Sequence, residues 1–98
     1  MLAGTGIKEQ VQEEICRFAE RHQLDKVVLF GSRARGDHRE RSDIDLAVSG
    51  GDPVRFALRA EDELPTLLSF DIVNLNGPVQ AELLESIQRE GITLYEKI

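Results

Sequence analysis

The chain has 98 residues, a length typical of one small domain, and 41% of them are hydrophobic, which is enough for a compact core. A formal net charge of −6 disfavours general nucleic-acid binding, which needs a net basic surface. The single cysteine, Cys16, excludes an internal disulfide, and no segment approaches the roughly 20 apolar residues of a membrane span. We therefore expect a cytoplasmic protein in which residues 1–98 form one domain.

An amphipathic helix is expected first. Its apolar residues recur at four- and three-residue spacing, which is one face of a helix, and Thr5 is the expected N-cap. The apolar positions are Ile7, Val11, Ile15, Phe18 and Ala19. This helix carries no chemical motif and is expected to lie on the core.

A short apolar segment, residues 26–30, ends at Gly31 and predicts a strand buried on both faces. Gly31 and Ser32 are then the turn from this strand into a short helix over residues 32–36. Residues 36–41 are polar and predict a loop.

The second predicted strand covers residues 43–48. Alternation of side chains places Asp43, Asp45 and Ala47 on one face of this strand. The opposite, core-facing side carries Ile44, Leu46 and Val48. Both carboxylates therefore point in the same direction, away from the core.

The second half of the chain continues the alternation of helix and strand. Asp52 suits an N-cap and Pro53 a first helical position, so a helix is expected from there toward Leu64, where Pro65 stops it. Residues 67–74 predict a third strand, and Asp71 lies in its middle. A carboxylate there is costly to bury unless it is paired or binds a cation.

The last two elements are a helix and a short strand. A turn at residues 76–78 opens the helix, which Gly91 closes, and residues 92–95 form the strand. The apolar stripe of this helix is Val79, Leu83, Leu84 and Ile87.

Three aspartates can converge if the second and third strands are neighbours. Asp43, Asp45 and Asp71 would then lie on one side of the sheet, where their charges repel one another. Bound divalent cations are the usual resolution, and oxygen-only ligands suit Mg²⁺ or Mn²⁺. Two such ions can activate a nucleophile and stabilise a leaving pyrophosphate.

The Gly-Ser turn supplies groups that complement phosphate. Gly31 lets the backbone approach closely, and the Ser32 hydroxyl and nearby N–H groups can donate hydrogen bonds. Arg33 and Arg35 add charge complementary to a triphosphate. Four of the twelve Lys and Arg residues lie between positions 33 and 41, and this local reversal of sign fits a small polyanion better than a nucleic-acid tract.

Each of these features alone is common in surface loops and strand edges. The combination is more specific, because an Asp-x-Asp motif begins eleven residues after Ser32 and a third aspartate follows on the next predicted strand. Residues 31–36 (Gly-Ser-Arg-Ala-Arg-Gly) and 42–46 (Ser-Asp-Ile-Asp-Leu) resemble the signature of the nucleotidyltransferase superfamily of DNA polymerase beta type. More narrowly, the chain resembles the minimal nucleotidyltransferases (MNT), which are about this long.

The resemblance extends from the first helix to the final strand and is most specific over residues 30–48. It implies an α/β (α+β) fold with a mixed sheet of about four strands and helices packed on it. It also implies that Gly31 and Ser32 contact the nucleotide phosphates, that Asp43 and Asp45 bind two Mg²⁺ ions, and that Asp71 is the third metal ligand and the base for the attacking hydroxyl. No position of this motif set departs from the family pattern.

The resemblance also implies a partner. Minimal nucleotidyltransferases typically pair with a helical HEPN protein as the antitoxin of a toxin–antitoxin module, and transfer AMP from ATP to a tyrosine of that toxin. Two alternatives stay open from the sequence: a non-catalytic nucleotide-binding antitoxin that masks its partner, and a subunit of a two-chain transferase acting on a small-molecule alcohol. The roles of Arg39 and Arg41 are open between phosphate binding and partner docking.

Overall fold

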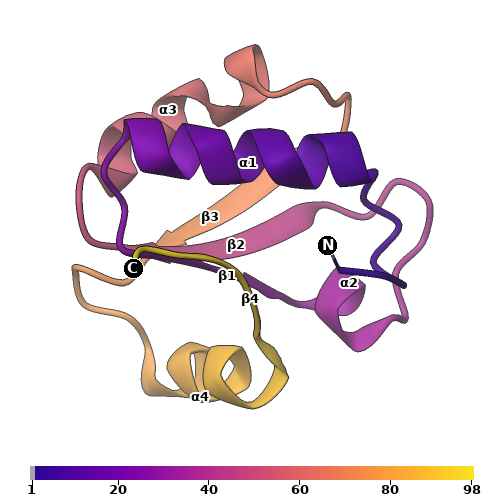
Figure 1. Cartoon of the computed structure of the whole chain (residues 1–98). Helices are drawn as coiled ribbons and strands as arrows, with labels where there is room; N and C mark the ends of the chain where they lie inside the picture. The colour runs from indigo at the N-terminus through magenta and orange to yellow at the C-terminus, as the bar shows by residue number, and fades with distance from the viewer. Residues whose placement is uncertain (1) are drawn as a thin grey trace.

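The computed structural model describes residues 2–98, in which helices and strands alternate along the chain. In chain order the elements are α1 (Glu9–Arg21), β1 (Lys26–Phe30), α2 (Ser32–Arg35), β2 (Ile44–Ser49), α3 (Pro53–Glu63), β3 (Phe70–Asn74), α4 (Ala81–Glu90) and β4 (Ile92–Glu96). Figure 1 shows them as one layered unit. No helix within residues 2–98 is long and apolar enough to cross a membrane.

The four strands form one mixed sheet in the order β3-β2-β1-β4. β1 is antiparallel to both β2 and β4, whereas β2 and β3 are parallel. A parallel pair needs a crossover connection, and α3 with its flanking loops supplies it. The expected mixed sheet of about four strands is confirmed.

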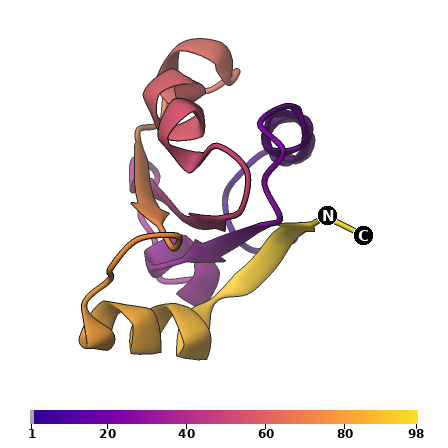
Figure 2. The same ribbon diagram turned by 90° about the vertical axis from the view of Figure 1, so that its left-hand side faces the viewer.

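Helices cover both faces of the sheet. α1 and α3 lie on one face and α4 on the other, as Figures 1 and 2 show. On the first face, Val27 and Leu29 of β1 join a large apolar cluster that includes Phe18 of α1 and Phe56 of α3. On the second face, a smaller cluster contains Phe30, Ala47 and Ile87. Each fully buried side chain of this size contributes about 1.5–3 kcal/mol, so β1 is held from both sides.

The start of α1 differs from the prediction. Lys8, and not Thr5, is the N-cap residue, and no side chain caps this helix end. Gly6 has φ +69° and turns the chain between Thr5 and the helix. The buried Thr5 hydroxyl instead accepts a hydrogen bond from the Ile7 N–H at 3.2 Å. The N-cap prediction for Thr5 is therefore wrong, because a glycine turn separates it from the helix.

The start of α3 agrees with the prediction. Asp52 is the N-cap and accepts a hydrogen bond from the Arg55 N–H at 3.1 Å, with Pro53 in the first turn. The helix ends at Glu63, and Leu64 is already extended before Pro65, as the steric restriction before proline requires.

Two later elements begin after their expected positions. β3 starts at Phe70, because Leu67 is fully exposed and the Ser69 carbonyl makes the first contact with β2 by accepting from the Ile44 N–H. α4 starts at Ala81, so Val79 lies before the helix rather than on its apolar stripe.

Candidate active site

The parallel pairing of β2 and β3 places two of the predicted aspartates side by side. Asp45 and Asp71 are direct register partners. Neighbouring strands lie about 4.8 Å apart, and residues in register point to the same face of a sheet. Asp43 is exposed and lies immediately before β2, two residues from Asp45. The three carboxylates are thus gathered at one corner of the sheet.

These carboxylates lie at the end of the apolar cluster under α4. Ala47 and Val73 follow Asp45 and Asp71 by two residues, and both belong to that cluster. The same face therefore changes from acidic to apolar along each strand in chain order. Asp71 is exposed, while Asp45 is half-buried.

The pKa of Asp45 is shifted by its surroundings. Its pKa is raised from 3.8 to about 6, first by burial and then by the negative charges of Asp71 and Asp43. The positive charges of Arg35 and Arg33 oppose this rise in pKa and do not cancel it. Ionised Asp45 is therefore destabilised in this environment, and a cation bound beside it would relieve both causes.

The donor set fits Mg²⁺, although the three aspartates do not form one closed cage. Within residues 2–98, no group of three or more His, Cys, Asp or Glu side chains is arranged to hold a single metal ion. Mg²⁺ is usually bound through one or two carboxylates, with substrate phosphates and waters completing its octahedron. Asp45, paired with either Asp43 or Asp71, offers such a partial set.

Gly31 brings the turn after β1 against Asp45. Phe30, the last residue of β1, is the register partner of Asp45. Gly31 has φ +74° and ψ −157°, a conformation that essentially only glycine adopts. A Cβ atom at this position would also collide with the Asp45 carboxylate. The glycine therefore allows the turn and keeps the space beside the carboxylate free.

Arg33 does not have the role predicted for it. The side chain is buried, with 1% exposure, and its guanidinium donates to three backbone carbonyls. These are Ser42 O at 2.9 Å, Thr5 O at 2.9 Å and Glu40 O at 3.1 Å. The prediction that Arg33 contacts phosphate is wrong for this geometry, because its donors already hold the loop before β2 and the N-terminal segment.

Arg35 has the position expected of a phosphate contact. Its side chain is 43% exposed, and its charge acts on Asp45. Hydrogen bonds from Arg35 raise the pKa of its guanidinium, which stays charged. The bond to Asp37 has the larger effect and the bond to Glu90 the smaller. Ser32 is half-buried at the start of α2, beside Gly31. Gly31, Ser32 and Arg35 are thus brought next to the aspartates.

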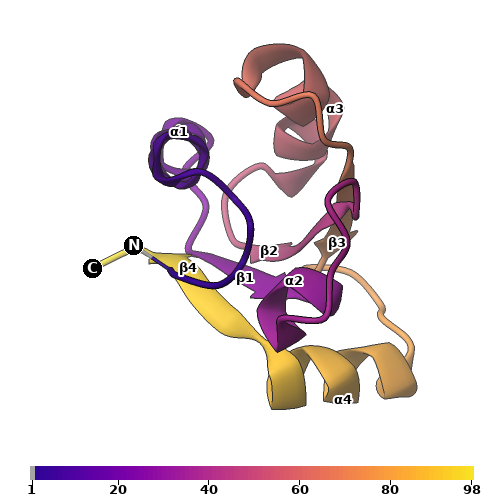
Figure 3. The same cartoon turned by 90° about the vertical axis from the view of Figure 1, so that its right-hand side faces the viewer.

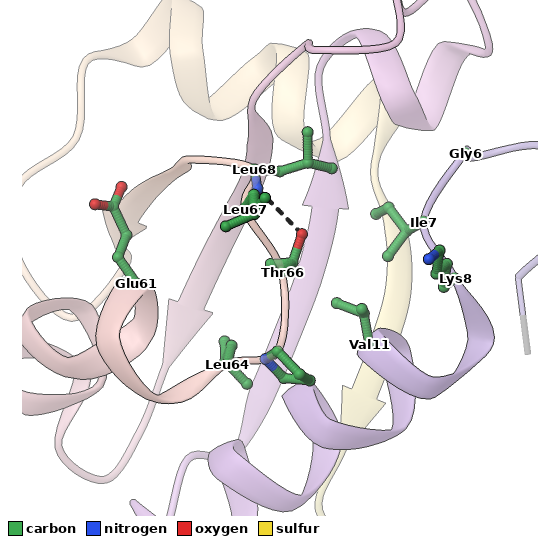
Figure 4. A pocket seen from close by; sticks show the side chains of 10 residues that line it. Gly6, Ile7, Lys8, Val11, Glu61, Leu64, Thr66, Leu67 and Leu68 are labelled. Carbon is green, nitrogen blue, oxygen red and sulfur yellow. Dashed lines mark hydrogen bonds between the residues drawn. The ribbon is translucent and has the colours of Figure 1, made fainter.

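A separate groove of about 710 Å³ lies on the other side of the sheet. Figure 4 shows it between the start of α1 and the segment that joins α3 to β3, with Leu64 and Val11 facing each other across it. None of the three aspartates lines this groove. The groove is therefore not part of the acidic corner, where Asp43 and Asp71 are exposed.

The sequence matches the model of a known protein family. The family model "Polymerase beta, Nucleotidyltransferase" matches residues 13–98. The chain belongs to this nucleotidyltransferase family. The predicted membership and the predicted enzyme class, nucleotidyltransferase, are both confirmed, and the reaction class implies a nucleotide substrate.

Individual relatives of this nucleotidyltransferase agree. "Putative protein adenylyltransferase MJ0604" of Methanocaldococcus jannaschii is 38% identical, over 76% of this chain and 82% of the relative. A solved structure described as "putative minimal nucleotidyltransferase" is 37% identical, with a TM-score of 0.63 over 83% of this chain and 86% of the other. A toxin–antitoxin crystal structure with AMP-PNP shares the fold, with a TM-score of 0.71 and 23% identity over 88% of this chain and 73% of that one.

Proposed function

We propose that this nucleotidyltransferase moves AMP from ATP to a hydroxyl of a protein partner and so acts as an antitoxin. The observation that supports this most is the register of Asp45 with Asp71 on neighbouring strands. The turn at Gly31 lies against Asp45, where only a residue without a Cβ atom fits. Two carboxylates thus lie beside the turn that we propose binds phosphate, and metal-assisted nucleotidyl transfer uses such an arrangement. We propose that residues 1–98 form one minimal nucleotidyltransferase domain that acts in the cytoplasm.

Asp43, Asp45 and Asp71 would hold two Mg²⁺ ions. When bound, these ions supply charge that stabilises the transferring phosphoryl group and the leaving pyrophosphate. Gly31 and Ser32 bind the phosphates of the nucleotide, and Arg35 adds a fixed positive charge.

The reaction is an in-line displacement. The acceptor oxygen forms a bond to the α-phosphorus of ATP, and the bond from that phosphorus to the bridging oxygen breaks, releasing pyrophosphate. Asp71 takes the proton of the acceptor hydroxyl, since it is exposed beside Asp45 and the acceptor arrives from solvent.

The acceptor is proposed to be a tyrosine of a helical HEPN-type toxin. The name of the 38% identical relative supports a protein acceptor. The acidic corner supports it independently, because Asp43 and Asp71 are exposed and lie outside the described groove. An open site of this kind suits an acceptor that a second protein presents.

The test is the intact mass of the partner. The chain is incubated with Mg²⁺, ATP and a HEPN-type candidate partner, to be sought in the reading frames beside its gene, and the partner is expected to gain the mass of one or more AMP groups. A partner in which the acceptor tyrosine is replaced by phenylalanine is expected to gain none. An unchanged partner mass with all four nucleoside triphosphates would refute the proposal.

The competing function, masking without chemistry, is separated by one variant. Replacing Asp43 and Asp45 together by Asn is expected to abolish transfer and to leave the apolar clusters intact, because neither carboxylate is part of them. Cells producing the toxin with this variant are expected to lose protection. Full protection by the variant would favour masking.

A further inference from the structure

Glu90 lies beside the site although it is 55 residues away from Arg35 in the sequence. Its carboxylate accepts a hydrogen bond from Arg35 Nη1 at 2.9 Å. The Glu90 side chain is 17% exposed, whereas Asp37, the other partner of Arg35, is 62% exposed. The contact with Glu90 is therefore the less solvent-screened of the two.

The fold fixes this position through β4. Glu90 is the last residue of α4, and Gly91 joins it directly to β4. A Cβ on Gly91 would meet Val28 and the Ile87 carbonyl, so this junction is tight. Ile92 pairs with Leu29, two residues before the Gly31 turn. Glu90 is thus brought to Arg35 at the end of α2, and Figure 3 shows α4 lying beside α2.

The ion pairs leave part of the guanidinium free. Asp37 accepts from Nε at 3.1 Å and Glu90 from Nη1, while Nη2 has no side-chain or backbone partner within residues 2–98. An arginine has five N–H donors, so up to three of them stay available to a ligand. Arg35 is fixed in place by these contacts without being saturated.

We propose that Glu90 is a positioning residue, which holds the Arg35 guanidinium beside the Gly31 turn so that its free donors meet the phosphates of the nucleoside triphosphate. This inference rests on the proposed function, since it requires a triphosphate at that turn. Immobilising a long side chain when a ligand binds costs conformational entropy. The contact with Glu90 already orders Arg35 before the nucleotide binds, so less entropy is lost on binding. The expected benefit is a roughly three- to tenfold tighter nucleotide complex.

Glu90 could also weaken nucleotide binding. Its negative charge repels a triphosphate and competes for Arg35. Competition would dominate if Glu90 saturated the guanidinium, but the unpartnered Nη2 shows that it does not. The two effects predict opposite changes in affinity when the carboxylate is removed.

The experiment measures the binding of α,β-methylene-ATP with Mg²⁺ by titration calorimetry, without acceptor. This analogue cannot release pyrophosphate, because carbon replaces the bridging oxygen. Glu90→Ala is expected to weaken binding roughly three- to tenfold. Glu90→Gln, which keeps an acceptor oxygen, is expected to recover most of the loss. Glu82→Gln is the matched control on the same helix, since the exposed Glu82 has no ion pair within residues 2–98, and it is expected to change nothing.

A double variant tests whether Glu90 acts through Arg35. Arg35→Ala with Glu90→Ala is expected to bind no more weakly than Arg35→Ala alone, with unchanged thermal unfolding. Additive losses, unchanged affinity in Glu90→Ala or tighter binding in Glu90→Ala would overturn the inference. If the unmodified chain fails to bind the analogue at all, the proposed function itself fails, and that result is distinguishable from a failure of Glu90 alone.

Discussion

Replacing Asp45 by Asn is expected to inactivate the enzyme and, in the absence of metal, to stabilise it. The pKa of about 6, against 3.8 for an ordinary aspartate, means that the folded state disfavours the ionised carboxylate. For a fully buried group this difference corresponds to about 3 kcal/mol at neutral pH. Asp45 is only half-buried, so screening by solvent reduces the expected gain to about 1 kcal/mol.

The pH dependence of this effect has a definite sign. Because the folded pKa is raised above the unfolded value, the cost of ionised Asp45 is complete above about pH 6 and is relieved as the pH falls toward 4. The advantage of Asp45→Asn is therefore expected at pH 7.5 and should vanish near pH 4. For a domain of this size, about 1 kcal/mol raises Tm by roughly 4–8 °C.

The assay is thermal unfolding with EDTA or with Mg²⁺, from pH 4 to pH 7.5. Mg²⁺ is expected to raise the Tm of the unmodified chain and to have little effect on Asp45→Asn, since a ligand that binds only the folded state stabilises it. Asp62→Asn, on the exposed face of α3, serves as the control, with an expected change within about 0.5 kcal/mol. A Tm of Asp45→Asn equal to or below that of the parent at pH 7.5 would refute the reasoning.

Three further substitutions test individual parts of the site. Gly31→Ala is expected to lower the free energy of unfolding by about 3 kcal/mol or more, because of backbone strain and a collision with Asp45. Gly36→Ala, also at positive φ but in open space, should lower it by about 1 kcal/mol. Chemical denaturation compares the two variants. Arg33→Lys is expected to lower stability by about 2 kcal/mol, because an ammonium cannot serve carbonyls in three directions, and to leave the KM for ATP nearly unchanged. Arg35→Ala is expected to raise the KM for ATP about tenfold without lowering Tm. A lower Tm with an unchanged KM would contradict the assignment of Arg35 to the phosphates.

Local signals in the sequence predicted most of the secondary structure. β1 was predicted with its observed bounds, because a continuous apolar segment ended by glycine has one plausible conformation. Asp52 and Pro53 fixed the start of α3 for similar local reasons. Thr5 was assigned wrongly because the chain reverses at Gly6, and a cap residue cannot be told from a turn residue by type alone.

The positions of the site residues relative to one another depend on the pairing of strands that are far apart in the sequence. The parallel register of Asp45 with Asp71 depends on how α3 crosses the sheet, although the shared strand pattern allowed it to be anticipated. Arg33 and Arg35 look alike in sequence, yet one is buried against carbonyls and the other faces the carboxylates. Glu90 had no local signal, because only the pairing of β4 with β1 brings it to Arg35.

The rate of AMP transfer by Asp45→Asn, Asp71→Asn and the double variant tests the central claim most directly. If the two carboxylates serve one metal-dependent centre, each single variant is expected to lose transfer by at least about 100-fold, and the double variant should be scarcely slower than either, because residues that act as a unit are not additive. Retention of the parental rate by folded Asp71→Asn, with saturating Mg²⁺ and ATP, would contradict the account.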